Sequence, residues 1–138
     1  MTFGEKVRAA REARNMTQEQ LANAIGMSKR MVSYWENHNK LPKSRDTYSI
    51  VAKVLGLDVE VLLDDNTEFV LRASESYGYR GAQQALQLVQ QITGLYAGGE
   101  LEEEDMDAMM KAIQDAYWIA KQKNKSHTNK RYLVKEEE

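Results

Sequence analysis

The sequence predicts an all-α protein, and three observations lead to this prediction. The chain of 138 residues contains a single proline, Pro42, so few positions forbid a continuous helix. Apolar residues recur at intervals of three and four along most of the chain, which is the spacing of one helix face. Residues that begin or end helices stand between these periodic segments.

Five short helices are expected in residues 1–65, which form the first predicted domain. Their expected ranges are 3–14, 18–24, 28–36, 44–55 and 59–63. Thr2 and Thr17 precede the first two ranges and Ser28 begins the third, and their hydroxyls can accept the free backbone N–H groups of a first turn. Gly26 ends the second helix, because glycine readily takes the positive φ of a helix end. Residues 37–42 are expected to form a loop.

The remainder of the chain predicts longer helices. Residues 66–80 are expected to form one helix, and two clearer apolar stripes cover 81–96 and 102–123. Gly98 and Gly99 separate the two stripes, which favours an antiparallel hairpin. We therefore predict a helical dimerisation or interaction region at 66–125 and a flexible tail at 126–138.

Several functional classes are not expected. Cysteine is absent, which excludes a disulfide framework and a thiolate zinc site, and favours a cytoplasmic location. No apolar run approaches the roughly 18 residues of a membrane span. No nucleophile motif, metal-ligand motif or phosphate-binding glycine loop is present, so we expect no enzyme, no cofactor and no metal. The stripe of Met106, Met109 and Met110 is interpreted as core or dimer seam rather than as a ligand pocket.

Charge is distributed unevenly along the chain. Residues 1–54 contain ten basic and five acidic residues, whereas residues 55–138 contain nine basic and sixteen acidic residues. A basic segment beside an acidic one suggests that the basic segment contacts nucleic acid.

Residues 17–37 have the pattern of two helices that cross through a tight turn. Ala22 is small enough for the crossing, and Gly26 permits the turn. Three apolar residues are expected to wedge the helices apart at a fixed angle: Leu21, Ile25 and Val32. The outer face and N-terminal end of the second of these helices can then enter a DNA major groove, and it carries Lys29, Arg30, Ser33 and Tyr34.

This pattern resembles the Cro/C1-type (XRE) family of phage repressors and bacterial regulators. The likeness comprises Thr17-Gln18, Leu21-Ala22, Ile25-Gly26, Val32-Ser33 and Trp35-Glu36-Asn37, and it continues through Val51-Ala52, Leu55-Gly56-Leu57 and Leu62-Leu63. It implies a five-helix, lambda-repressor-like domain that binds double-stranded DNA, usually as a repressor. The family commonly has glycine after this Glu-Asn pair, and here the residue is His38.

The resemblance also implies roles for individual residues. Gln18, Asn37 and Lys43 would contact phosphates, which fix position without reading sequence. The set that would face the bases is Ser28, Lys29, Arg30, Ser33 and Tyr34, with Arg30 the best candidate for guanine. Arg11 and Glu36 match a partly buried ion pair of the family. Trp35 is interpreted as a packing residue rather than as a base contact.

The C-terminal half admits three interpretations. The first is a homodimer interface, because one helix-turn-helix domain buries too little surface for tight specific binding. The second is a module that binds a regulatory protein, since residues 115–121 and 125–132 resemble the tails of mobile-element regulators of Gram-positive bacteria, some of which are paired with a zinc metallopeptidase. The third is the toxin-binding part of an antitoxin.

Overall fold

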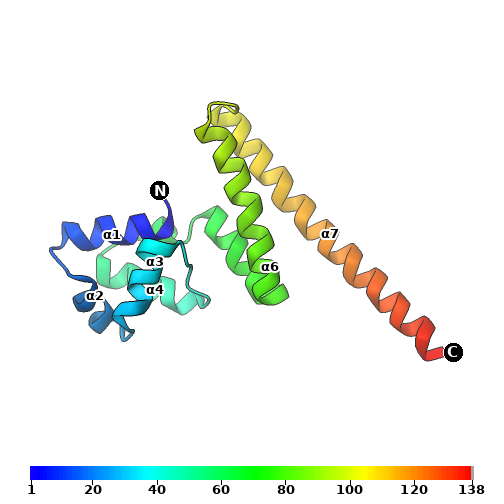
Figure 1. Ribbon diagram of the computed structural model, residues 1–138, viewed down its shortest axis with the longest axis horizontal. Coiled ribbons are helices and arrows are strands. Elements are labelled where there is room, and N and C mark those ends of the chain that lie inside the picture. Colours follow the sequence, from blue (N-terminus) through cyan, green and yellow to red (C-terminus); the bar gives the residue numbers. More distant parts are fainter. Residues whose placement is uncertain (138) are drawn as a thin grey trace. The chain divides into compact units, whose positions relative to one another are not determined.

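The computed structural model describes the backbone of residues 1–137 and the side chains of residues 1–124. All regular structure in this part of the chain is helical, which confirms the predicted all-α class (Figure 1). The helices are α1 (Phe3–Ala13), α2 (Gln18–Ile25), α3 (Lys29–His38), α4 (Arg45–Leu55), α5 (Val59–Leu62), α6 (Asp65–Ala97) and α7 (Glu103–Glu137). None of the described helices combines the length and the apolarity that crossing a membrane requires.

The chain divides into two compact units, Met1–Ala82 and Gln83–Glu138. The first unit contains the five predicted short helices, and their ends follow the local signals of the sequence. The Thr2 hydroxyl accepts the Glu5 N–H, and Thr17 forms a reciprocal capping box with Gln20. Gly26 and Gly56 end α2 and α4 in the left-handed conformation, at φ 73° and 68°.

The core of the first unit is formed by buried apolar faces of α1 to α5. The fully buried side chains include Trp35, Tyr48, Leu21, Leu62, Val7, Val32 and Val51. Phe3 lies edge-on to both Trp35 and Tyr48, with ring centroids 5.6 and 5.3 Å apart. Gly4 lets α1 approach α3 closely, because a Cβ at Gly4 would overlap the carbonyl oxygen of Trp35.

The first half of α6 also belongs to this unit. Residues 66–80 lie in α6, as the predicted helix there requires, with an interruption at Gly78, and the compact unit runs to Ala82. Leu71 joins the same buried cluster as Tyr48. Arg45 makes two hydrogen bonds to Glu68, at 2.6 and 2.8 Å, and two to Glu75, at 2.9 and 3.0 Å. These contacts join residues far apart in sequence, which local patterns cannot predict.

Helix α6 is interrupted at Gly78. Its backbone has φ 71° and ψ −160°, a combination that essentially only glycine adopts. We expect Gly78→Ala to lower the free energy of unfolding by about 1–3 kcal/mol, although an added Cβ would meet no atom within 4 Å. Urea unfolding followed by circular dichroism measures this change.

Gly94→Ala is the matched control for this prediction. Gly94 lies in the same helix at an ordinary φ, and a Cβ there also meets nothing within 4 Å. Alanine should therefore stabilise the helix at Gly94, by up to about 1 kcal/mol. An equal gain from Gly78→Ala would contradict the interrupted backbone.

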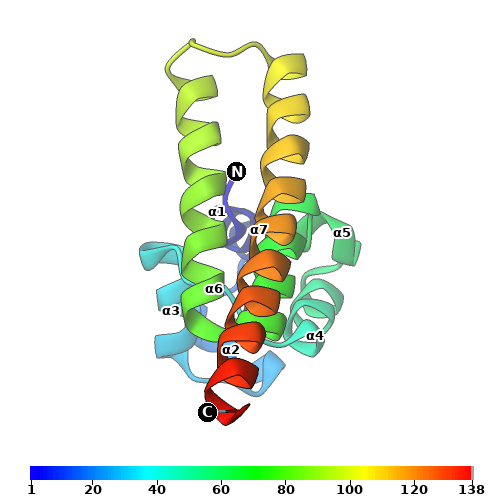
Figure 2. The same cartoon turned by 90° about the vertical axis from the view of Figure 1, so that its right-hand side faces the viewer.

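The second unit contains the end of α6 and α7, which run antiparallel through the turn at residues 98–102 (Figure 2). This arrangement confirms the predicted hairpin. Among its side chains up to residue 124, the buried apolar ones are Ala85, Ile92, Met110 and Tyr117. Helix α7 continues to Glu137, whereas the sequence predicted a flexible tail from residue 126. The side chains of residues 125–138 lie outside the described part, so the tail stays a prediction.

Candidate nucleic-acid interface

The turn between α2 and α3 fixes how the two helices cross. Gly26 takes the left-handed conformation, and the Met27 N–H donates to the Ala22 carbonyl at 2.9 Å. The expected wedge is buried, since Leu21 and Val32 have no exposed area and Ile25 has little. Helix α3 is therefore held with one face in the core, and its other face is left for a ligand.

The N-terminal half of α3 presents cations and hydroxyls outward. Lys29 and Arg30 are exposed, and Ser33 and Tyr34 are half-buried beside them. Ser28 is also exposed, but its hydroxyl accepts the Met31 N–H at 3.2 Å and caps the helix. A basic helix end without any carboxylate in its first turn suits an anionic partner.

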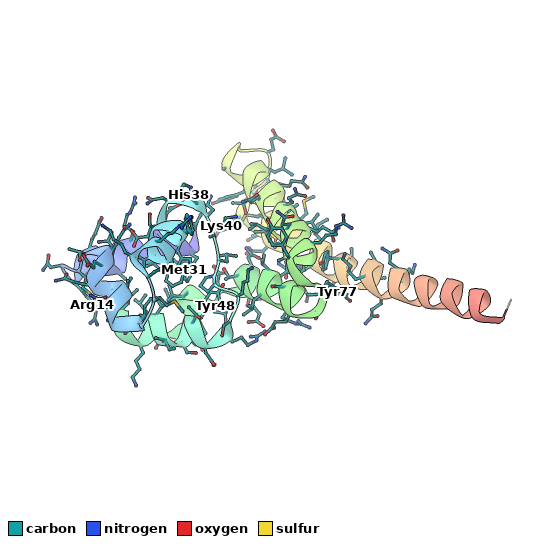
Figure 3. The ribbon with its side chains drawn as sticks, turned by 60° about the horizontal axis from the view of Figure 1, so that its bottom comes forward. Arg14, Met31, His38, Lys40, Tyr48 and Tyr77 are labelled. Carbon is teal, nitrogen blue, oxygen red and sulfur yellow. The ribbon has the colours of Figure 1, made fainter. Side chains whose placement is uncertain are left out.

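Three side chains of α3 form a row at intervals of four residues. The Arg30 Nε donates to the Tyr34 hydroxyl at 2.6 Å, and the Arg30 guanidinium carbon lies 5.2 Å from the centre of the Tyr34 ring. The His38 ring meets the Tyr34 ring edge-on, at a centroid distance of 5.7 Å. Figure 3 shows His38 and Lys40 where α3 ends, with Met31 nearer its start.

Helix α3 is longer than predicted. The sequence predicted its end at Glu36 and a loop over residues 37–42, but the helix continues to His38. The reason lies at Asn39, which takes the left-handed conformation at φ 51°. His38 is helical here, and the left-handed residue that follows it is an asparagine, which tolerates this conformation better than most residues.

Asn37 consequently lies within the last turn of α3. Its amide donates to the Ser33 hydroxyl at 3.1 Å, and its amide oxygen accepts from Arg8 of α1 at 2.6 Å. Two residues predicted to contact DNA, Ser33 and Asn37, are therefore joined to each other and to α1.

A charged cluster ties α1 and α2 to the end of α3. Arg11 binds Glu36 through two parallel hydrogen bonds of 2.9 Å, and its third nitrogen donates to the Met16 carbonyl at 2.7 Å. Arg8 also donates to Glu36, at 3.2 Å, and the Gln18 amide donates to it at 3.3 Å. The Glu36 side chain has 0% exposed area and that of Arg11 has 11%.

Burial by itself raises the pKa of Glu36, but the donors around it outweigh this effect. Hydrogen bonds from Arg11, Gln18 and Arg8 hold the pKa of Glu36 below its ordinary value. The Glu36 hydrogen bond in turn raises the pKa of Arg11. The pair is therefore ionised in the folded protein at neutral pH.

The structure brings most of the predicted site residues together, and it separates one. Gln18 and Asn37 flank the Glu36 cluster beside α3, whereas Lys43 lies in the following loop, with its ammonium 5.8 Å from the Tyr79 ring centre. Arg8 was missed by the sequence analysis. Its position one turn before Arg11, on the same face of α1, is the signal that could have indicated it.

Comparison with known proteins identifies this arrangement. Residues 7–62 match the helix-turn-helix family. The chain is similar to that family over these residues, which lie in the first unit. The match covers α2, the turn and α3, and it confirms the resemblance drawn from the sequence.

Two similar proteins are regulators of transcription or of phage immunity, judged by their names. The immunity repressor protein of Bacillus phage phi105 is 25% identical over 146 residues that cover the whole of both chains. The HTH-type transcriptional activator BcrR of Enterococcus faecalis is 29% identical over 76 residues, which cover 55% of this chain and 37% of that protein. No solved structure matches the chain significantly. The helix-turn-helix match and these relatives together support a DNA-binding transcriptional regulator.

Proposed function

We propose that the chain is a dimeric repressor that reads an inverted-repeat operator with α3. One observation carries this proposal: the wedge residues turn one face of α3 into the core and leave Lys29 and Arg30 exposed on the other. An exposed helix of this kind fits the major groove, where each base pair presents a distinct set of donors and acceptors.

The contacts divide into two groups. Ser28, Lys29, Arg30, Ser33 and Tyr34 lie on the side of α3 that is turned toward the bases, and Arg30 reads a guanine. Gln18, Asn37 and Lys43 contact phosphates on either side. Gln18 keeps a second amide N–H for this contact, because its hydrogen bond to Glu36 uses one of two.

Repression is favoured over activation by the extent of the two likenesses. The phage immunity repressor matches along both complete chains, including the C-terminal half. The activator BcrR matches over 76 residues only. The likeness to the repressor therefore includes the C-terminal half, which is the part proposed to join two DNA-binding domains.

Dimerisation is proposed for the hairpin of the second unit. Two helices bury only part of their apolar residues, and many in this hairpin remain half-buried: Leu86, Leu88, Val89, Leu95, Met106, Ile113 and Trp118. Met109 and Ile119 are exposed. A second copy of the hairpin would cover such a surface and place two α3 helices on one operator.

Selection from a pool of random DNA duplexes tests the function. The full chain is incubated with the pool at two salt concentrations, and the bound fraction is sequenced. We expect an inverted repeat with half-sites one helical turn apart, about 34 Å. The affinity should fall steeply between about 50 and 200 mM salt, because phosphate contacts release counterions.

Light scattering of the same sample measures the oligomeric state. A dimer together with an inverted repeat supports the proposal. A monomer that selects single half-sites would contradict the dimer and favour a C-terminal half that binds a toxin or a metallopeptidase. Absence of any enriched sequence from a folded sample would contradict sequence-specific binding itself.

A further inference from the structure

The row Arg30, Tyr34 and His38 restricts an exposed side chain of the recognition helix. A free arginine at such a position would sample many rotamers, and ordering it on DNA would cost conformational entropy. Here the Tyr34 hydroxyl accepts from Arg30 Nε at 2.6 Å. The Tyr34 ring is contacted by His38 one turn further on, at 5.7 Å between centroids. Side chains four residues apart on a helix are neighbours, so the helix itself sets this arrangement.

The atom that binds Tyr34 determines which atoms are left for DNA. Arginine has five N–H donors, and the single one on Nε is directed to Tyr34. The four on the two Nη atoms remain at the far end of the guanidinium. Guanine presents two acceptors, O6 and N7, in the major groove, and a pair of N–H groups can bind both. The hydrogen bond therefore favours an end-on approach through Nη1 and Nη2.

We propose that Tyr34 is a positioning residue for Arg30 and determines specificity at the base pair that Arg30 reads. This inference rests on the proposed function, and it differs from the sequence prediction that Tyr34 contacts bases itself. The ring and hydroxyl of Tyr34 hold the guanidinium before DNA arrives, and His38 supports the ring. Preorganisation of this kind increases affinity because less freedom is lost on binding.

The test compares Tyr34→Phe with the natural chain in the selection described above. Phenylalanine keeps the ring but removes the acceptor of the Arg30 hydrogen bond. We expect affinity for the selected operator to fall about tenfold, as for loss of a hydrogen bond to a charged group. The loss of sequence preference should be confined to the base pair at which Arg30→Ala also loses it. In the Arg30→Ala background, Tyr34→Phe should have no further effect.

Tyr96→Phe is the matched control, because Tyr96 is an exposed tyrosine in the second unit and loses the same hydroxyl. Light scattering should give the same oligomeric state for Tyr96→Phe as for the natural chain, and operator affinity should then be unchanged. The thermal unfolding midpoint of Tyr34→Phe should equal that of the natural chain, which separates positioning from a structural defect.

Each other outcome overturns the inference in a distinguishable way. An unchanged guanine preference and affinity in Tyr34→Phe would show that Arg30 needs no positioning, and the proposed function would still stand. A loss of preference at a different base pair would make Tyr34 a direct base contact. If the natural chain selects no operator, the proposed function and this inference fail together.

Discussion

Replacing Glu36 with glutamine is expected to lower the free energy of unfolding of the first unit by about 3–5 kcal/mol, because the buried Arg11 charge then keeps only the exposed Glu12 carboxylate, at 3.9 Å, as a counter-charge. Glutamine has nearly the same shape, so the change removes charge and creates no cavity. Arg11 cannot turn to solvent easily, since only 11% of its side chain is exposed. Urea denaturation at neutral pH, followed by circular dichroism, measures the loss.

Arg8→Gln is the matched control for the ion pair. Arg8 donates to the same carboxylate, but 46% of its side chain is exposed. Its removal should cost no more than about 1 kcal/mol, as is usual for exposed pairs. Equal losses from Arg8→Gln and Glu36→Gln would show that the buried Arg11–Glu36 pair contributes no more to the free energy of unfolding than an exposed pair.

The same two chains give a pH test with a definite sign. Because the folded-state pKa of Glu36 lies below its ordinary value of 4.5, the ion pair stabilises the fold above that pH. The contribution is lost as the pH falls through the folded-state pKa. Asp64 and Glu68 also have lowered pKa values, so the natural chain and Glu36→Gln should both lose stability in acid. The difference between them should shrink as the pH falls.

The sequence predicted the parts of the fold that depend on local signals. Thr17 and Gly26 mark the two ends of α2 through hydrogen bonds within a few residues, and the structure contains both. The end of α3 was misplaced because either of two asparagines, Asn37 or Asn39, could have ended the helix. Asn37 instead bonds to Ser33 inside the helix, and Asn39 takes the left-handed conformation. Which asparagine ends the helix depends on how the last turn is formed.

The features that could not be predicted depend on contacts between residues far apart in the sequence. Leu71 enters the core of the first unit, and Arg45 binds Glu68 and Glu75, yet no pattern near these residues indicates their partners. The site shows the same division. The Arg11–Glu36 pair was predicted because the family resemblance carries it. The bond from Arg30 to Tyr34 depends on rotamers that a family pattern does not record.

Replacing Trp35 with alanine is expected to lower the free energy of unfolding by about 3–5 kcal/mol, the usual cost of truncating a buried aromatic residue. Trp35 is 1% exposed and packs edge-on against Phe3, which in turn packs on Tyr48. Truncation would leave a cavity near Gly4, where α1 lies against the backbone of α3. Urea denaturation of the full chain measures the loss.

Trp35→Phe separates packing from hydrogen bonding. The indole Nε1 of Trp35 is buried and finds no acceptor among the residues whose side chains are described. Phenylalanine removes this unsatisfied donor, which costs about 1–3 kcal/mol when buried, and so offsets part of the lost volume. Trp35→Phe should therefore be clearly more stable than Trp35→Ala. If both variants instead unfold like the natural chain but lose operator affinity, Trp35 contacts DNA and its interpretation as a packing residue is wrong.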